Sequence, residues 1–375
     1  MRSHDVVVVG YGPVGAVLAA RLGALGVSTL VVEADVDLFR LPRAVAADDE
    51  VAHLLDQTAP GLLDGAVTAP DVRFVSRDHQ PLGRIAFPDG PHGTPGLSLF
   101  HQPTLEARLR AHVATLAAVE VRLGTALESF LADSQGVTAR LSDGTTARGS
   151  WLVGCDGAAS LVRRQAGIPW VGRDLPQQWL VADVEGDVTD RRGFTYTCDP
   201  ARPQVDMPVP AGHRWEWLLR DAQDRDVSAL IRRDTDAQDL SVVRAVTYQF
   251  GARRAAHWRR GPVLLAGDAA HTMPPFAGQG LGAGVRDAWS LSWRLASGDP
   301  DGYEEERLPH VRAMTRLSLF LGAVLQTGSA PLATARDAGL RAAFTAPALG
   351  RWLGRGGPRQ TRSGVWESWL SHASS

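Results

Sequence analysis

The sequence predicts an α/β fold in which a βαβ domain is interrupted twice by a β-sheet-rich domain and followed by C-terminal helices. Within the first 33 residues, two buried, strand-like runs flank a glycine turn and a helical segment. Residues 71–98 and 174–252 instead consist of short runs punctuated by proline and glycine, which is typical of antiparallel strands. With 375 residues, the chain is long enough for more than one structural unit.

The elements of the first domain follow from the spacing of apolar residues. The runs 5–9 and 28–33 are expected to be buried parallel strands, because they are almost continuously apolar. Residues 14–25 between them have helical spacing. The run 262–266 predicts another buried strand, and residues 281–325 predict two amphipathic helices.

Domain boundaries are placed where these patterns change. The discontinuous first domain comprises residues 1–70, 99–173 and 253–330, the β-rich domain residues 71–98 and 174–252, and a short C-terminal segment residues 331–375. We expect the two β-rich stretches to form one sheet that covers the first domain.

Composition excludes several classes of function. The net charge of -2 favours neither nucleic acid nor an anionic membrane as a partner. Two cysteines, Cys155 and Cys198, provide neither a disulfide framework nor a metal cluster, and no apolar run approaches the roughly 20 residues of a membrane span. We therefore expect a cytoplasmic protein without a metal. All 39 basic residues other than histidine are arginines, which excludes Schiff-base catalysis and the lysine of a phosphate-binding P-loop.

The first motif, VVVVGYGPVG, places G-x-G-x-x-G after a strand and at the start of a helix. Gly10 would make the sharp turn, Gly12 would let a pyrophosphate approach the backbone, and Gly15 would let helix and strand pack closely. The unpaired N–H groups of the helix N-terminus favour an anion there. Glu33, at the end of the second strand, could accept hydrogen bonds from ribose hydroxyls.

Two further motifs also lie between a strand and a helix. GCDGAASLVRR places Asp156 next to Gly157, where a carboxylate suits a second contact near a nucleotide, although Asp-Gly is also an ordinary turn. LLAGDAAHTMPPFAGQGLGAG places Asp268 at the end of a buried strand and a glycine-rich turn before a helix that begins near Leu281. The positive end of that helix would face whatever occupies the turn.

Together, these three blocks resemble those of the flavoprotein aromatic hydroxylases, the single-component FAD monooxygenases with the para-hydroxybenzoate hydroxylase fold. The resemblance covers most of residues 1–325, and residues 196–219 and 284–288 are most similar to the 3-(3-hydroxyphenyl)propionate hydroxylase branch. It implies a Rossmann-like, GR2-type FAD-binding domain interrupted by a substrate-binding sheet.

The resemblance also implies roles for individual residues. Glu33 and the glycines of the first motif would hold the ADP half of FAD, Asp268 its ribityl chain, and Pro275 its isoalloxazine ring. Arg43 would lie near the flavin and influence NAD(P)H use, and Gln102 would lie beside FAD. The full set of expected cofactor-binding residues is Gly10, Gly12, Pro13, Val14, Gly15, Glu33, Ala34, Arg43, Gln102, Asp156, Gly157, Gly267, Asp268, Pro275, Gly278, Gly280, Leu281 and Gly282. Many relatives have asparagine at the position of Gly282, so weaker helix capping and a freer loop are expected here.

The implied activity is insertion of one oxygen atom from dioxygen into a phenolic or polycyclic aromatic substrate through a flavin hydroperoxide. FAD would be bound non-covalently, NADPH or NADH would be the transient reductant, and the protein would be a monomer or homodimer with no nucleic-acid or membrane partner. Two alternatives remain open. One is epoxidation, Baeyer–Villiger insertion or oxidative rearrangement on the same fold, and the other is a non-catalytic flavin-binding protein.

No catalytic side chain is assigned, because the flavin would carry the chemistry. Four aromatic residues are candidates for the substrate pocket: Tyr196, Trp215, Trp217 and Phe276. Alternation along RWEWLL places Trp215 and Trp217 on the same face of a strand, which favours core packing over a pocket wall. His101, His213 and His271 could act as a base on a phenol, but a lone histidine is more often structural.

Overall fold

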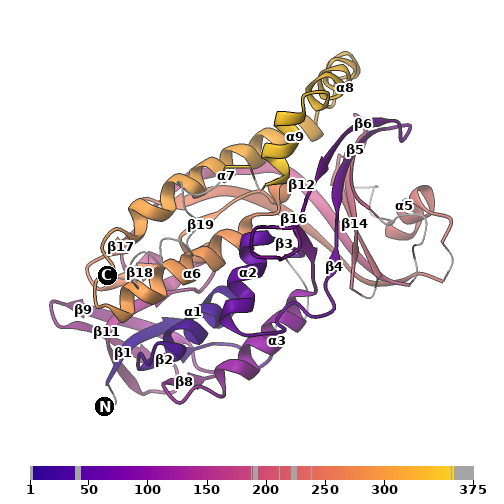
Figure 1. Ribbon diagram of the computed structural model, residues 1–375. Coiled ribbons are helices and arrows are strands. Elements are labelled where there is room, and N and C mark those ends of the chain that lie inside the picture. Colours follow the sequence, from indigo (N-terminus) through magenta and orange to yellow (C-terminus); the bar gives the residue numbers. More distant parts are fainter. Residues whose placement is uncertain are drawn as a thin grey trace.

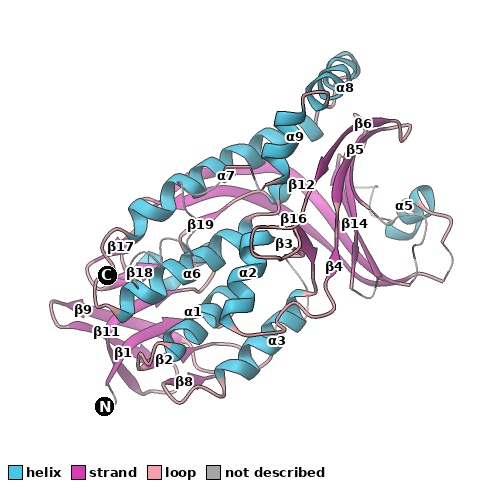
Figure 2. Ribbon diagram, in the orientation of Figure 1, coloured by secondary structure: helices cyan, strands magenta, loops and turns pink. Residues whose placement is uncertain are grey.

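The computed structural model describes residues 3–38, 44–186, 188, 193–210, 212–220, 226–237, 239–355 and 357–358. Two large sheets and a small one combine with helices in a mixed α/β arrangement, which confirms the predicted fold class (Figures 1 and 2). Residues 359–375 of the expected C-terminal segment lie outside the described residues.

The first sheet belongs to the βαβ domain. Its eight strands are β1 (Ser3–Val9), β2 (Thr29–Val32), β8 (Val119–Arg122), β9 (Leu127–Asp133), β10 (Gly136–Leu141), β11 (Thr146–Gly154), β17 (Arg259–Arg260) and β18 (Val263–Leu265). They follow the order β17-β18-β11-β1-β2-β8, with β10 and β9 attached to β11. Strands β8, β2, β1, β11 and β18 pair in parallel, so the carboxyl ends of β1, β11 and β18 meet at one edge.

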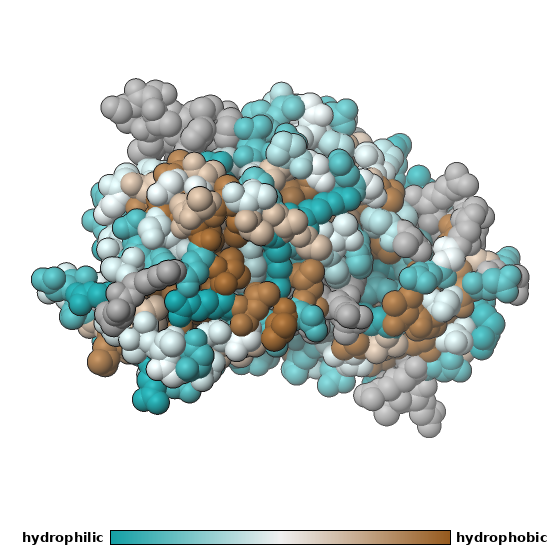
Figure 3. Space-filling view, turned by 90° about the horizontal axis from the view of Figure 1, so that it is seen from below, coloured by the Kyte–Doolittle hydropathy of each residue, from teal (hydrophilic) through white to brown (hydrophobic). Residues whose placement is uncertain are grey.

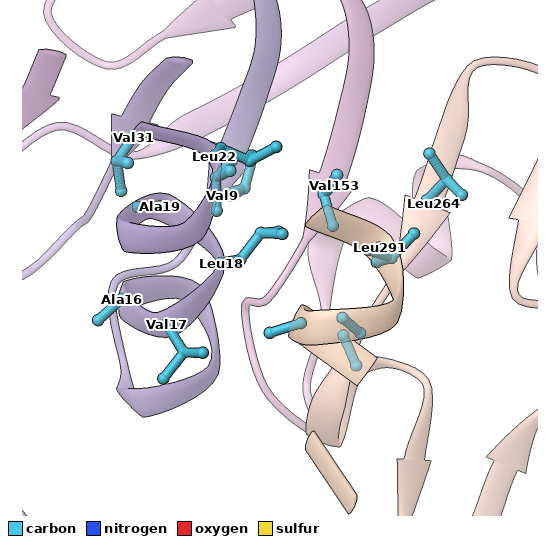
Figure 4. Packing of buried hydrophobic residues seen from close by; sticks show 14 of the residues in the cluster. Val9, Ala16, Val17, Leu18, Ala19, Leu22, Val31, Val153, Leu264 and Leu291 are labelled. Atoms are coloured by element: carbon cyan, nitrogen blue, oxygen red, sulfur yellow. The ribbon is translucent and has the colours of Figure 1, made fainter. Parts of the chain in front are cut away.

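Helices pack on this sheet and also on the second large sheet described below. The described helices are α1 (Pro13–Ala24), α2 (Asp49–Thr58), α3 (Gln102–Val113), α4 (Leu161–Gln165), α5 (Val227–Asp234), α6 (Gly280–Ala296), α7 (Tyr303–Leu325), α8 (Ala330–Phe344) and α9 (Pro347–Gly354), with 3-10 turns η1 (Gly267–Ala269) and η2 (Pro275–Ala277). Figure 4 shows Leu22 of α1 close to Val9, and Leu291 of α6 beside Val153 and Leu264. These five side chains belong to one buried cluster, which joins α1, α6 and three parallel strands.

The second sheet takes its strands mainly from the two β-rich stretches, and it also includes residues 170–173, 253–255 and 271–272 of the predicted first domain. The strands are β5 (Asp71–Ser76), β6 (Pro81–Ala86), β12 (Trp170–Glu185), β13 (Phe194–Cys198), β14 (Gln204–Val209), β15 (Gly212–Leu219), β16 (Ser241–Ala255) and β19 (His271–Thr272). Their order is β19-β16-β12-β15-β14-β13-β5-β6, so β13 and β5, more than a hundred residues apart in the chain, are neighbours. A small three-stranded sheet of β3 (Ala46–Asp48), β7 (Leu97–Leu99) and β4 (Val67–Thr68) lies between the larger two (Figure 1).

The two faces of the second sheet bury different side chains. Trp215 and Trp217 pack with Leu230 and Ile231 of α5, which lies on the outer face in Figure 1. Trp179 instead packs with the cluster that includes Phe276 of η2 and therefore faces the first domain. We call the face that carries Trp179 the inner face.

The C-terminal helices extend along and beyond the body. α8 projects at the top of Figure 1, and only Ala333 among its residues is buried. The side of the molecule in Figure 3 carries apolar and polar residues interspersed over its surface. Among the described helices, none combines the length and apolarity that crossing a bilayer requires.

Candidate functional site

The turn between β1 and α1 is shaped by close backbone packing. Gly10 has φ of +97°, and a Cβ there would lie 2.5 Å from the carbonyl oxygen of Cys155. A Cβ on Gly15 would overlap the carbonyl oxygen of Gly10. Gly12, the N-cap of α1, has open space where its Cβ would be, and no side chain caps the helix. The turn therefore leaves the positive end of α1 accessible, with Pro13 in its first turn.

Glu33 follows β2 and lies beside this turn. Its Oε2 accepts a hydrogen bond of 2.6 Å from the backbone N–H of Tyr11, and its Oε1 accepts one of 3.0 Å from that of Asp35. Ala34 lies between the two acidic residues. These bonds hold the carboxylate at the carboxyl end of β2, next to the glycine turn.

Asp156 lies on the other side of the turn, directly after β11. Its Oδ2 accepts hydrogen bonds from the backbone N–H groups of Leu161 (2.7 Å) and Val162 (3.1 Å) at the start of α4. Its Oδ1 is buried and has no hydrogen-bond partner among the described residues. Gly157 follows with φ of +75°. Half of the Asp156 carboxylate is thus used for helix capping, and the other half remains able to accept a hydrogen bond.

The turn after β18 contacts the first turn directly. A Cβ on Gly267 would lie 2.9 Å from a methyl group of Val14, and one on Gly284 would lie 2.5 Å from it. Val14 therefore fits between the Gly267–Asp268 turn and α6 only because both neighbours are glycines. Asp268 itself is exposed at this junction.

The segment before α6 reverses direction at Gly278, which has φ of +65°. α6 begins at Gly280 without a side-chain cap, and a Cβ on Gly280 would meet open space. Leu281 and Gly282 complete the first turn, so a second positive helix end is accessible near the first. Pro275 precedes this segment in η2.

Gly282 leaves room for a hydrogen-bond network. A Cβ on Gly282 would lie 3.0 Å from Nη1 of Arg286 and 3.2 Å from Oε1 of Gln279. Gln279 donates to Asp48 (2.9 Å), and Arg286 donates to both carboxylate oxygens of Asp48 (2.9 and 2.8 Å). Burial alone would raise the pKa of Asp48, but Arg286 and the hydrogen bonds bring the pKa below its usual value. α6 lacks a side-chain cap, as expected, but Gln279 ties the loop to β3 and does not leave it free.

A second buried network supports the turn after β18. The Oδ2 atom of Asp287 accepts a hydrogen bond of 3.1 Å from the backbone N–H of Gly267 and lies 2.6 Å from Nε2 of His271. Arg307 of α7 donates to Oδ1 of Asp287 at 2.9 Å. Burial would raise the pKa of Asp287, but His271 and Arg307 lower it. Asp287 and Arg307 were not predicted from the sequence, because their contact depends on the packing of α7 against α6.

Two expected cofactor contacts have different outcomes. Gln102 begins α3; its Oε1 accepts a hydrogen bond of 2.7 Å from the backbone N–H of Ala44, and its Nε2 donates to Glu106 at 2.7 Å. It therefore fixes the segment that follows Arg43, and Arg43 itself lies outside the described residues.

The structure brings together only two of the four pocket candidates. The hydroxyl of Tyr196 donates a hydrogen bond of 2.8 Å to the carbonyl oxygen of Phe276. Phe276 contacts Trp179, with ring centroids 5.3 Å apart. Trp215 and Trp217 lie on the outer face of the sheet, under α5, where they pack in the core.

The three candidate histidines each have a side-chain partner. His271 bonds Asp287, and His213 lies 3.2 Å from Oδ1 of Asp206. His101 lies 2.9 Å from the hydroxyl of Thr104 at the start of α3. His213 also contacts Trp215 on the outer face, with ring centroids 4.3 Å apart, away from Phe276.

The inner face also carries a charged cluster that alternation alone did not reveal. Arg214 of β15 donates two hydrogen bonds to Asp183 of β12, at 2.6 and 2.9 Å. Arg244 of β16 donates to the same carboxylate at 3.3 Å. The pairing of three strands brings these residues together, which is why local sequence could not predict the cluster.

The described residues fit the FAD that the sequence resemblance implies. Two uncapped helix ends converge at the carboxyl edge of a parallel sheet, where nucleotides bind in open α/β folds. Gly12 and Gly280 have open space at their Cβ positions, and the Oδ1 atom of Asp156 lacks a partner among the described residues. The inner face of the second sheet then lies beside the η2 segment, where an aromatic ring could approach a flavin.

Comparison with known proteins gives an independent result. The family model described as FAD binding domain matches residues 3–318. The chain is 37% identical over 371 residues to a 3-(3-hydroxy-phenyl)propionate/3-hydroxycinnamic acid hydroxylase of Mycobacterium sp. (strain JLS), covering 93% of this chain and 65% of that relative. It is 36% identical over 367 residues to a probable NADH-specific resorcinol 4-hydroxylase of Rhodococcus jostii (strain RHA1), covering 91% and 69%. The chain thus spans less than two thirds of the mycobacterial relative.

Solved structures share the fold over almost the whole chain. The p-nitrophenol 4-monooxygenase PnpA of Pseudomonas putida DLL-E4 superposes with a TM-score of 0.84 at 25% identity, covering 96% of this chain and 100% of that one. An aklavinone-11 hydroxylase in complex with FAD and aklavinone gives a TM-score of 0.76 at 28% identity, covering 87% and 70%.

Proposed function

This chain belongs to the FAD-binding-domain family that matches residues 3–318, and we propose that it is an FAD-dependent monooxygenase of the aromatic hydroxylase type. Electrons would come from NADH or NADPH, and one oxygen atom of dioxygen would enter a phenolic or polycyclic aromatic substrate. The observation that carries the proposal is the convergence of two uncapped helix ends beside an aromatic face of the second sheet.

The cofactor site would be divided among three turns. The glycine turn before α1 would take the pyrophosphate, and Glu33 the adjacent ribose. Asp268 would bind the ribityl chain, and the backbone of residues 280–282 would face the flavin ring. When bound, FAD supplies the redox chemistry that activates dioxygen, and the chain contributes orientation, charge and exclusion of water.

The start of α6 would stabilise negative charge on the flavin. A helix N-terminus is equivalent to about half a positive charge, and α6 presents its end without a competing side-chain cap. Asp287, on α6 itself, bonds the turn after β18 and Arg307 of α7. These bonds hold the helix in place, so the backbone N–H groups at its start need no rearrangement when the flavin becomes negatively charged.

The second sheet would form the other wall of the site. Tyr196, Phe276 and Trp179 form a buried aromatic surface next to η2. Such a wall excludes water, which would otherwise favour release of peroxide over oxygen transfer. We assign residues 71–98 and 174–252 to this substrate-binding domain.

The proposal also covers the reductant, the oligomeric state and the location of the protein. A relative described as NADH-specific supports a nicotinamide reductant, with NADH and NADPH both to be tested. The two free cysteines support a cytoplasmic location, and the low net charge supports the absence of a nucleic-acid or membrane partner. The protein would act as a monomer or homodimer.

The test is product analysis with isotope-labelled dioxygen. Purified protein loaded with FAD would be given NADH or NADPH and a panel of phenols, including resorcinol and p-nitrophenol. We expect substrate-stimulated NAD(P)H oxidation and a product that contains one labelled oxygen atom. Peroxide without labelled product would contradict the proposal and favour a non-catalytic flavin-binding protein, whereas a labelled epoxide or lactone would favour the alternative oxygenations.

A further inference from the structure

Glu216 is a carboxylate in the middle of β15 that the proposed function does not yet include. Among the described residues, none forms a hydrogen bond or ion pair with its carboxylate. It is partly exposed, whereas Trp215 and Trp217 on either side of it in the strand are buried on the outer face. Alternation along β15 therefore directs Glu216 to the inner face.

Strand register shows what surrounds Glu216. It lies opposite Val205 of β14 and opposite Val181 of β12. Val205 in turn lies opposite Tyr196 of β13, so one row across the inner face contains Tyr196, Val205, Glu216 and Val181. The carboxylate thus has apolar neighbours on both sides and lies in the row of the tyrosine that bonds Phe276.

The charged residues two positions along these strands form their ion pairs with one another and not with Glu216. Asp183 of β12 lies opposite Arg214 of β15 and Arg244 of β16, and both arginines bond Asp183. Burial raises the pKa of Glu216 and Asp183 adds to this effect, whereas Arg214 and Arg244 oppose it. His101, before α3, is within electrostatic reach of Asp183 and Arg214, which indicates that the first domain approaches this part of the inner face.

A carboxylate in such surroundings favours a hydrogen-bond donor. Without a partner, its desolvation costs free energy, and a donor from a ligand would recover part of that cost. The aromatic side chains of Tyr196, Trp179 and Phe276 in the same cluster suit a planar ring. A ring hydroxyl supplies the missing donor, whereas a ligand carboxylate would be repelled.

We propose that Glu216 is a substrate-binding residue that accepts a hydrogen bond from a hydroxyl group of the aromatic substrate. The substrate is accordingly a ring that presents a hydroxyl, and not a carboxylate, to β15. This inference rests on the proposed function, because it places the ring between the inner face and the flavin site.

The test compares binding of phenols and their methyl ethers to the FAD-loaded protein. Dissociation constants for resorcinol and 1,3-dimethoxybenzene would be measured from tryptophan fluorescence and from the visible spectrum of the flavin. We expect wild-type protein to favour resorcinol by about tenfold or more, since a hydrogen bond to a charged group contributes that much. Glu216→Leu should bring the ratio close to one, and Glu216→Gln should give an intermediate ratio because its carbonyl still accepts.

An anionic ligand separates a specific role from general damage to the site. The anion 3-methoxybenzoate should bind Glu216→Gln more tightly than wild type, because the variant removes the repelling charge. Misfolding would weaken every ligand and could not produce this gain. Glu185→Gln, which changes an exposed carboxylate at the end of the neighbouring β12, should leave all three affinities unchanged.

Three results would overturn the inference: equal binding of resorcinol and its ether by wild type, the same ratio in Glu216→Leu as in wild type, or no binding of either ligand. The proposed function has a separate criterion. If FAD does not bind, or if no labelled oxygen enters any product, that proposal fails whatever the ligand ratios are.

Discussion

The site has two halves that are built in different ways. The half around α1 and α6 is made mostly of backbone: glycines at positions 10, 12, 15 and 280, and two helix ends that no side chain caps. The inner face of the second sheet is made of side chains that come from β12, β13, β14, β15 and β16. The first half can therefore bind the same group wherever the fold recurs, whereas the second can change with each substitution on a strand.

This contrast predicts that the backbone half is sensitive to a single methyl group. Gly15→Ala should destabilise the fold by about 3 kcal/mol or more, because the new Cβ would overlap the carbonyl oxygen of Gly10. Urea unfolding of the two proteins measures this difference. A change below about 1 kcal/mol would show that α1 can shift away from β1 at little cost.

Gly12→Ala is the matched control in the same turn. Its Cβ would meet open space, and φ of -71° suits alanine, so stability should stay within about 0.5 kcal/mol of wild type. FAD affinity, measured by titration of apoprotein, should nevertheless fall by about tenfold or more, equivalent to about 1.4 kcal/mol. Unchanged affinity would mean that the pyrophosphate does not approach Gly12.

The same contrast explains what could be predicted from sequence. The glycine turns were predictable because a strand, a tight turn and a helix are adjacent in the chain and have a local signature. The Asp183, Arg214 and Arg244 cluster was not, because two strand pairings must form before these side chains, up to 61 residues apart in the chain, can meet. Alternation did separate Arg214 and Glu216 from Trp215 and Trp217, but could not tell which face lies inward.

The half around α1 and α6 also depends on the buried cluster of Asp287, His271, Arg307 and His310. Lowering the pH tests this dependence. Burial, and then Arg307, lower the pKa of His310 on α7 from 6.5 to about 2. Other charged groups near it are Arg286, Asp287 and His271. Because the pKa of His310 is lower in the folded protein than in the unfolded chain, its contribution to stability is complete above the pKa of the unfolded chain. That contribution is lost as the pH falls toward the pKa of the folded protein. Between pH 7 and pH 5, this histidine should cost about 2 kcal/mol of stability.

His310→Gln removes the titrating group and should flatten this part of the stability curve. Urea unfolding at pH 7 and pH 5 measures the difference for each protein, and only the change with pH is compared. His257→Gln, at an exposed position, should retain the wild-type pH dependence. If the free energy of unfolding falls by the same amount between pH 7 and pH 5 in His310→Gln and in wild type, other groups cause the acid sensitivity.

The smallest expected effect lies where the two halves meet. Tyr196→Phe removes the hydroxyl that donates to the carbonyl oxygen of Phe276 and keeps the ring that stacks on Phe74. Stability should fall by about 1 kcal/mol, because one buried hydrogen bond is lost. This bond is one of the contacts that hold η2, together with that from Ser318 to the carbonyl oxygen of Pro274, whereas α6 is held separately through Asp48 and Asp287. FAD affinity should therefore change less than resorcinol affinity, both measured on the same preparation. If FAD affinity falls as much, the two halves form one cooperative site, and the distinction between a backbone half and a side-chain half does not extend to binding.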